Sequence, residues 1–316
     1  MQNENVPVKN KRVAVMDLGT NTFHLLIAEG PADNFNELFH TNEGVKLGEG
    51  GINRGIIQQL AFERGIAAMQ RFQSHIQAHN VHEVKAIATS AIRNAANGND
   101  FIAQVKENAG IQIELITGEQ EAAYIYTGIK ASGCLTEENA LIMDIGGGSV
   151  EFIIGNKNEV FWKQSFEIGA ARLMDKFHQT DPIPVQSIKE LTRYLDGKLG
   201  ELFKAALQYR PSILIGSSGA FESFAEVIEL EKGKSFNLKQ TRVYEFDTDD
   251  LLDLIERLAK STHKERAAIK GIIPVRVDMI VVASLITIYI MQKIGLTDVT
   301  MSTYSLKEGV LAKMLS

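Results

Sequence analysis

The sequence predicts an α/β protein of two similar domains with an active-site cleft between them. Three observations support this fold class. Strand-like and helix-like segments alternate along the chain of 316 residues, as expected for sheets covered by helices. The hydrophobic content is 45%, enough for large cores, and the length suggests two domains. A short Asp-x-Gly pattern that ends a strand occurs once in each half.

The first half begins with a predicted hairpin. Residues 13–28 form two β-like runs that are broken at DLGTNT, and the strand signal continues over 37–50. Apolar residues recur at helical spacing over 56–79. The remaining segments are a strand (83–91), a loop and helix (93–110), a strand (111–117) and a helix with an acidic first turn (118–132).

The second half repeats this order, beginning with a strand pair over 140–154. The apolar run at 279–291 has 13 residues, too few to cross a bilayer, so it predicts a buried helix. The other predicted segments are strand then helix (160–177), helical patterns (186–208), strand, turn and helix (211–228), and helices over 248–270, 278–293 and 305–314.

The composition excludes several classes of partner. A net charge of −6 argues against a broad basic face, so we expect no nucleic-acid partner. We also expect no membrane partner. The polar N-terminal stretch MQNENVPVKNKR has no apolar core, which argues against a signal peptide. The single cysteine, Cys134, fits a reducing compartment. We therefore expect a cytoplasmic protein.

The two Asp-x-Gly hairpins look like copies of each other. With an offset of 127 residues, Met16 aligns with Met143, Asp17 with Asp144, and Gly19 with Gly146. Successive backbone N–H groups in a glycine turn bind anions, whereas an adjacent carboxylate repels them unless a cation lies between. The pattern therefore predicts Mg²⁺ beside each turn and a polyphosphorylated ligand held between the two copies. A plain hairpin is the simpler interpretation of one copy alone.

Several segments resemble the Ppx/GppA phosphatases, a family of exopolyphosphatases and guanosine pentaphosphate phosphohydrolases in the actin-like ATPase superfamily. The matching segments follow the family's order from end to end: DLGTNTFHLLIAE (17–29), VKLGEG (45–50), ATSAIRNAANGNDFI (88–102), ITGEQEAAYIYTGI (116–129), DIGGGSVEFIIG (144–155), IGAARL (168–173), LIGSSGAFES (214–223), IIPVRVDMI (272–280) and STYSLKEGVL (302–311).

The resemblance implies two actin-like (ribonuclease H-like) domains, residues 1–122 and 123–316. The last helix, 305–316, is expected to belong to the second domain or to pack back on the first. The chain resembles the short form of the family, without the further helical domains of longer members. Domains of this kind commonly dimerise, so a homodimer is a further expectation.

The resemblance also implies a general base at the start of the helix that follows ITG. The family usually has two adjacent glutamates there, whereas this chain has Gln120 and Glu121. We assign the base to Glu121, with Glu119 as the alternative. Asp144, Glu151 and Asp17 are the expected Mg²⁺ ligands.

The expected phosphate-binding residues come from four small or polar segments. Arg93 is expected to offer a forked cation to a terminal phosphate. The complete expected set is Gly19, Thr20, Asn21 and Thr22; Thr89, Ser90 and Arg93; Gly146, Gly147, Gly148 and Ser149; and Gly216, Ser217 and Ser218.

The function implied by the resemblance is Mg²⁺-dependent hydrolysis of the terminal phosphate of inorganic polyphosphate, with Glu121 activating water. Removal of the 5′-phosphate of guanosine pentaphosphate is the near alternative. An ATP-dependent kinase or an inactive polyphosphate-binding regulator is an alternative of another class. The chain departs from the family at Ser305 and Lys307, where the family tends to have glycine and arginine.

Overall fold

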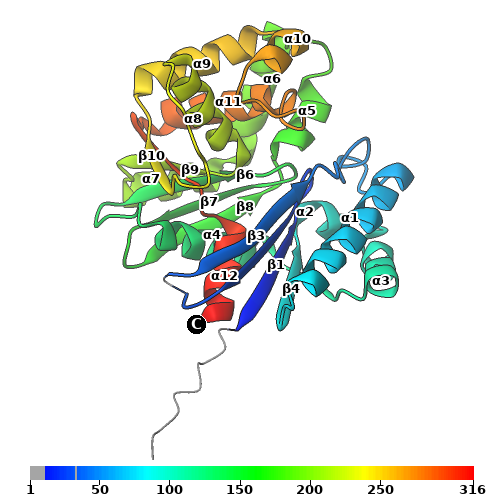
Figure 1. Cartoon of the computed structure of the whole chain (residues 1–316). Helices are drawn as coiled ribbons and strands as arrows, with labels where there is room; N and C mark the ends of the chain where they lie inside the picture. The colour runs from blue at the N-terminus through cyan, green and yellow to red at the C-terminus, as the bar shows by residue number, and fades with distance from the viewer. Residues whose placement is uncertain (1–10, 33) are drawn as a thin grey trace, which may run out of the picture.

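The computed structural model describes residues 11–32 and 34–316. The prediction about a signal peptide concerns mainly residues 1–10 and lies outside the described residues. The described chain forms two β-sheets with helices on both faces of the pair, so the predicted α/β class is confirmed (Figure 1).

The first sheet has the strand order β3-β2-β1-β4-β5. Its centre is an antiparallel hairpin of β1 and β2, and β4 runs parallel to β1. The strands are β1 (Arg12–Leu18), β2 (Phe23–Glu29), β3 (Asn36–Glu43), β4 (Glu83–Ala88) and β5 (Ile113–Leu115). The helices of this half are α1 (Gln59–Ala78), α2 (Ser90–Arg93), α3 (Gly98–Ala109) and α4 (Gly118–Ser132).

The second sheet has the order β10-β11-β9-β6-β7-β8, which repeats the first arrangement and adds β10 at the edge. Its hairpin is β6 with β7, and β9 runs parallel to β6. The strands are β6 (Ala140–Ile145), β7 (Val150–Gly155), β8 (Val160–Phe166), β9 (Ile213–Ser217), β10 (Val243–Glu245) and β11 (Asp298–Ser302). The helices are α5 (Ala170–Phe177), α6 (Val185–Lys198), α7 (Gly200–Tyr209), α8 (Gly219–Glu231), α9 (Thr248–Lys260), α10 (His263–Ala268), α11 (Met279–Ile294) and α12 (Leu306–Leu315). This duplicated topology confirms the predicted pair of similar α/β units.

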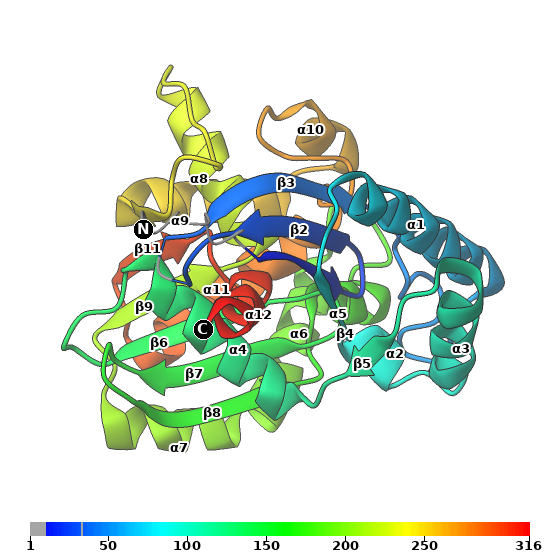
Figure 2. The same ribbon diagram turned by 60° about the horizontal axis from the view of Figure 1, so that its bottom comes forward.

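Two helices, α4 and α12, fill the space between the sheets (Figure 2). Side chains alternate between the two faces of a strand. Val13 and Val15 of β1 and Ile142 of β6 therefore share a core with α4 and α12, while Met16 packs with α1 and α3 on the outer face. By the same alternation, Asp17 and Asp144 face the layer formed by α4 and α12.

Close packing of α4 against α12 depends on two glycines. A Cβ atom added at Gly309 of α12 would lie 1.8 Å from the carbonyl oxygen of Tyr124 in α4. A Cβ atom at Gly128 would lie 2.0 Å from the carbonyl oxygen of Ser305. The two helices therefore approach backbone to backbone, and the start of α12 is fixed beside the strand ends.

The structure adds details that the sequence did not predict. Strands β10 and β11 were missed, and the patterns over 186–208 and 248–270 are each two helices. The predicted division after residue 122 falls inside α4 and stays a prediction. Within the described ranges, no helix is both long enough and apolar enough to cross a membrane.

Candidate active site

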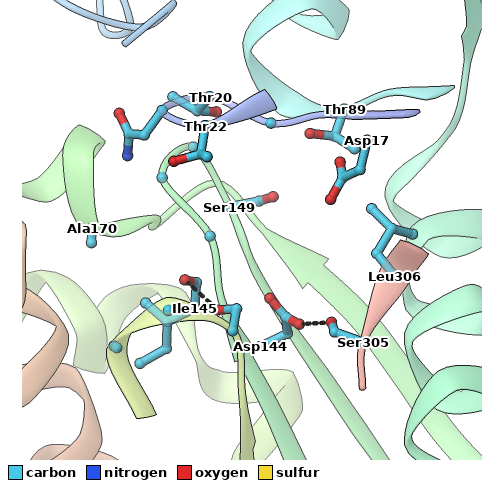
Figure 3. Close-up of a pocket in the computed structure, with 18 of the residues that line it drawn as sticks. Asp17, Thr20, Thr22, Thr89, Asp144, Ile145, Ser149, Ala170, Ser305 and Leu306 are labelled. Carbon is cyan, nitrogen blue, oxygen red and sulfur yellow. Dashed lines mark hydrogen bonds between the residues drawn. The ribbon is translucent and has the colours of Figure 1, made fainter. Parts of the chain in front are cut away.

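A cavity of about 180 Å³ lies between the two hairpin turns (Figure 3). Both hairpins, α4, the start of α5 and the start of α12 contribute to its wall. Many of the sequence-predicted site residues line this cavity. They are Asp17, Gly19, Thr20, Asn21, Thr22, Thr89, Ser90, Glu121, Asp144, Gly146, Gly147, Gly148, Ser149, Glu151 and Ser218.

The turn of the first hairpin, residues 19–22, is fixed by a neighbouring loop. The N–H of Gly19 donates to the carbonyl oxygen of Thr22 at 3.2 Å and closes the turn. The carbonyl oxygens of Thr20 and Asn21 accept from the N–H groups of Gly48 and Lys46. The turn is therefore rigid before any ligand arrives.

The turn of the second hairpin, residues 146–149, is fixed by the start of α5. The carbonyl oxygens of Gly146 and Gly147 accept from the N–H groups of Ala170 and Ala171, each at 2.9 Å. Because the N–H of a planar trans peptide points opposite to its carbonyl oxygen, the amides that follow point away from α5. This is the orientation that an anion cradle requires.

The two turns touch each other across the cavity. A Cβ atom at Gly147 would lie 2.3 Å from the side-chain nitrogen of Asn21. A Cβ atom at Gly148 would lie 2.5 Å from the hydroxyl of Ser90 and 2.7 Å from that of Thr20. A side chain at either position would collide with these groups, so the glycines allow the two turns to lie in direct contact.

Three buried carboxylates, Glu121, Asp144 and Glu151, line the cavity together with the half-buried Asp17. Asp144 accepts hydrogen bonds from the hydroxyls of Ser217 (2.5 Å) and Ser305, and the latter bond is drawn in Figure 3. Glu151 accepts from the hydroxyl of Ser165 at 2.6 Å.

These carboxylates resist ionisation because they are removed from water and crowd one another. Burial raises the pKa of Asp17 to about 7, with a further contribution from Asp144. Burial also raises the pKa of Asp144, and raises that of Glu151 well above its usual range, where Glu121 adds repulsion. A concentration of buried acid of this kind is typical of a functional site.

Glu121 lies in the first turn of α4, where a capping box orients the helix start. The hydroxyl of Thr117 accepts from the N–H of Gln120 at 3.2 Å, and the side chain of Gln120 accepts from the N–H of Thr117 at 2.8 Å. The amide oxygen of Gln120 thus completes the capping box at the start of α4. Glu121 is only 6% exposed and points into the cavity wall.

Arg93 holds the carboxylate of Glu121. One guanidinium nitrogen donates to Glu121 and to the carbonyl oxygen of Ile116, both at 3.0 Å. Burial raises the pKa of Glu121 more than Arg93 lowers it, and repulsion from Asp17 and Asp144 adds to the rise. The pKa of Glu121 is therefore about 8. Glu119, the alternative base, has a side chain that is 77% exposed and lies 3.6 Å from Lys163.

Comparison with known proteins agrees with this geometry. The model of the Ppx/GppA phosphatase family matches residues 26–316. The chain belongs to the Ppx/GppA phosphatase family. Exopolyphosphatase 1 of Mycobacterium tuberculosis is 26% identical over 307 residues, which cover 96% of this chain and 88% of the relative.

Solved structures of Ppx/GppA proteins are also similar. The crystal structure of an exopolyphosphatase from Cytophaga hutchinsonii is 41% identical, with a TM-score of 0.94, and the match covers 96% of this chain and 98% of that one. The Aquifex aeolicus PPX-GPPA enzyme is 25% identical with a TM-score of 0.78, covering 96% and 99% of the two chains.

Not every residue expected from the Ppx/GppA pattern lines the cavity. Arg93 does not line the cavity, because its guanidinium is bound to the carboxylates of Glu121 and Glu167. The hydroxyl of Ser217 donates a hydrogen bond to Asp144 but does not line the cavity. Gly216 lies under the ring of Phe221, because a Cβ atom there would be 2.2 Å from the ring. These residues support the wall of the cavity.

The structure of this Ppx/GppA chain also places residues in the cavity wall that sequence reasoning missed. They are His24, Glu222, Arg276 and Lys307. Burial pulls the pKa of Lys307 down, but Glu308 and Glu222 outweigh it and raise that pKa to about 12. Burial and Lys307 lower the pKa of His24 well below 6.5, so its ring is neutral. The repeat of the two hairpins could have indicated one of these residues, because His24 of the first hairpin aligns with Glu151 of the second.

The expected metal is consistent with the donor chemistry of the site. Within residues 11–32 and 34–316, no three or more His, Cys, Asp or Glu side chains lie close enough together to hold a metal ion by themselves. Mg²⁺ commonly binds one or two carboxylates and completes its shell with water and substrate phosphates. Asp17 Oδ1 is buried without a hydrogen-bond partner in the described structure, and Asp144 and Glu151 offer further hard oxygen donors.

Proposed function

We propose that this protein is an exopolyphosphatase that hydrolyses the terminal phosphate of inorganic polyphosphate. The observation that carries the proposal is the position of Glu121, a buried carboxylate in the wall of a cavity enclosed by two glycine turns. The name of the similar Cytophaga hutchinsonii protein supports polyphosphate as the substrate.

The two hairpin turns bind the substrate in this proposal. The amides of residues 147–149 and the hydroxyls of Thr20 and Ser149 offer donors to phosphate oxygens from opposite sides of the cavity. Lys307 adds a positive charge to the same wall. The substrate is therefore held by both domains, and its terminal phosphorus lies within the closed cavity, away from bulk water.

Glu121 acts as the general base. It accepts a proton from a water molecule, whose oxygen attacks the terminal phosphorus while the bond from that phosphorus to the bridging oxygen breaks. The products are orthophosphate and a chain shorter by one phosphate. Arg93 orients the Glu121 carboxylate, and the pKa of about 8 makes it a strong enough base near neutral pH.

We propose Mg²⁺ as the cofactor, held by Asp144, Glu151 and Asp17. The ion would neutralise negative charge on the phosphate oxygens. Burial raises the pKa of all three carboxyl groups, and a bound cation would favour their ionised forms. The division into residues 1–122 and 123–316, a cytoplasmic location and a homodimer are further parts of the proposal, and light scattering of the purified protein tests the last.

The test is phosphate release by the purified protein with Mg²⁺ from short polyphosphate, long polyphosphate, guanosine pentaphosphate and ATP in parallel. Glu121→Gln should reduce release from polyphosphate by roughly 10²- to 10⁴-fold, the usual contribution of a general base. Glu119→Gln, an exposed neighbour on the same helix, is the matched control and should remain active. Release from guanosine pentaphosphate alone would change the substrate, and release from none would reject the proposal.

A further inference from the structure

Glu167 joins the two domains through an unusual set of contacts. It lies between β8 and α5, and its carboxylate accepts from Ser90 Oγ at 2.8 Å, Arg172 Nη2 at 2.7 Å and Arg93 Nη2 at 3.4 Å. Ser90 and Arg93 belong to α2 in the first half of the chain, and Arg172 belongs to α5 in the second half. Three donors from both halves therefore converge on one carboxylate.

The donors are held in place by contacts that do not involve Glu167. Arg93 is fixed by Glu121 and by the carbonyl oxygen of Ile116. Arg172 donates from Nε to the carbonyl oxygen of Gly148 and from Nη1 to that of Ile52, both at 3.0 Å. If the carboxylate moved away, both guanidinium groups would keep their positions.

The exposure of the partners shows which one is able to move. The side chains of Arg93 and Arg172 are 17% and 14% exposed, whereas that of Glu167 is 44% exposed. Glu167 also follows the end of a strand, so its side chain can rotate into solvent without disturbing the core. The donors around Glu167 are therefore fixed, whereas the Glu167 carboxylate that accepts from them can move.

This group lies next to both parts of the proposed chemistry. Arg93 also contacts Glu121, and Arg172 also contacts the Gly148 carbonyl of the second turn. Ser90 lines the cavity directly. Paired guanidinium groups with a hydroxyl are typical donors for phosphate, whose oxygens replace those of a carboxylate in the same geometry.

Ser90 and Arg93 are phosphate-binding residues that the resemblance to the Ppx/GppA family already implies. We propose that Arg172 completes an anion subsite with them beside the cavity, and that Glu167 occupies this subsite as an internal competitor. The ligand is a phosphate group of the substrate or free orthophosphate, which displaces the Glu167 carboxylate on binding. The proposal rests on the proposed function only for the identity of the substrate, because orthophosphate binding requires no hydrolysis.

The test is calorimetric titration of orthophosphate into the wild-type protein and into Glu167→Gln. Removing the competing charge should tighten phosphate binding about tenfold, roughly the value of one charge-assisted hydrogen bond. Glu137→Gln is the matched control, because it removes an equal charge from an exposed pair with Lys157 away from the cavity. In the Glu167→Gln background, Arg172→Lys should reverse the gain.

The outcomes separate the proposal from its alternatives. Equal or weaker phosphate binding by both Glu167→Gln and Glu167→Ala, with unchanged thermal melting, would show that Glu167 only clasps the two arginines and would overturn the subsite. An equal gain in the Glu137→Gln control would reduce the effect to net charge. Tighter phosphate binding without any polyphosphate hydrolysis would support the subsite and reject the proposed function.

Discussion

Asp144 and Glu151 lie directly opposite each other across the β6–β7 hairpin, and both are buried. In the first hairpin the same cross-strand position pairs Asp17 with His24, whose ring is neutral. The duplicated hairpins therefore differ in charge, with two acids in one copy and one acid in the other. Carboxyl groups therefore concentrate on the second hairpin, which offers more oxygen ligands to a cation than the first hairpin does.

The raised pKa of Glu121 predicts the pH dependence of catalysis. The base is active when ionised, and its pKa is about 8. Below that pH, kcat/KM should rise about tenfold per pH unit, and it should level off above it. The measurement is a pH profile with saturating Mg²⁺ and short polyphosphate. If kcat/KM stayed constant between about pH 6 and 8, where one ionisation should change it about tenfold per pH unit, Glu121 would not be the general base.

The buried acids predict how stability depends on pH without metal. The pKa of Asp17 is about 7 in the folded state against its ordinary 3.8, so the folded protein keeps a proton that the unfolded chain releases. The stabilising effect is therefore complete below the unfolded value and is lost as the pH rises through about 7. We expect the Tm of metal-free protein to fall as the pH is raised over this interval.

Added Mg²⁺ should raise the Tm more at a pH near the folded pKa of Asp17, about 7, than at a pH near its ordinary pKa of 3.8. The reason is that Mg²⁺ binds the ionised acids. Samples treated with a chelator give the metal-free baseline in scanning calorimetry. An Asp144→Asn variant should lose most of the Mg²⁺-dependent gain. The same gain at both ends of the interval would contradict a site built from these carboxylates.

The contact between the turns predicts the effect of a single methyl group. Gly148→Ala would place a Cβ atom 2.5 Å from the hydroxyl of Ser90, so the two domains could close only with a displaced turn. We expect kcat/KM to fall by about 10²-fold, the scale of a 1 Å misplacement of reacting groups. Steady-state kinetics with short polyphosphate make the comparison.

Gly197→Ala is the matched control for that variant. Gly197 lies inside α6 with open space around the position of a Cβ atom. This substitution should leave activity unchanged and stabilise the protein by about 1 kcal/mol, the difference in helix propensity. Full activity of Gly148→Ala would show that the turns separate during catalysis.

Substrate binding should depend on the positive charge of Lys307 more than on the shape of its side chain. Its ammonium group is 3.0 Å from Glu308, and its pKa of about 12 keeps it charged at any working pH. Lys307→Met should raise KM for polyphosphate by about tenfold or more, because a buried charge partner of the phosphates is lost. Lys307→Arg, which restores the residue usual in the family, should keep most of the affinity.

Much of the cavity wall was predictable because its signals are local, whereas the roles of Glu121 and Arg93 were implied only by the resemblance to the Ppx/GppA family. The two Asp-x-Gly turns, the acidic start of α4 and the small-residue turn after β9 each occupy a few consecutive residues, and the repeat linked the first two. The contacts of Arg172 with Ile52 and of Ser305 with Asp144 join residues more than a hundred positions apart. Such pairs follow from tertiary packing, which short-range patterns do not encode.

The missed strands have a similar explanation. β10 has only three residues, and β11 pairs in parallel with β9, which precedes it by about eighty residues of chain in the sequence. Gly197 and Gly200 flank the break between α6 and α7 at Leu199, but the apolar spacing of Leu195, Leu199 and Leu202 continues across it and concealed it. Distance along the chain, more than weak local propensity, limited the prediction.

The position of α12 has a consequence for synthesis on the ribosome. Leu306, Val310 and Leu311 complete the core between the two sheets, although about 190 residues of chain separate them from the last strand of the first sheet. The inner face of the first sheet therefore stays without α12 while those residues emerge, on the order of ten seconds or more at ordinary elongation rates. The cavity is complete, with Ser305 on Asp144, only once α12 has been made.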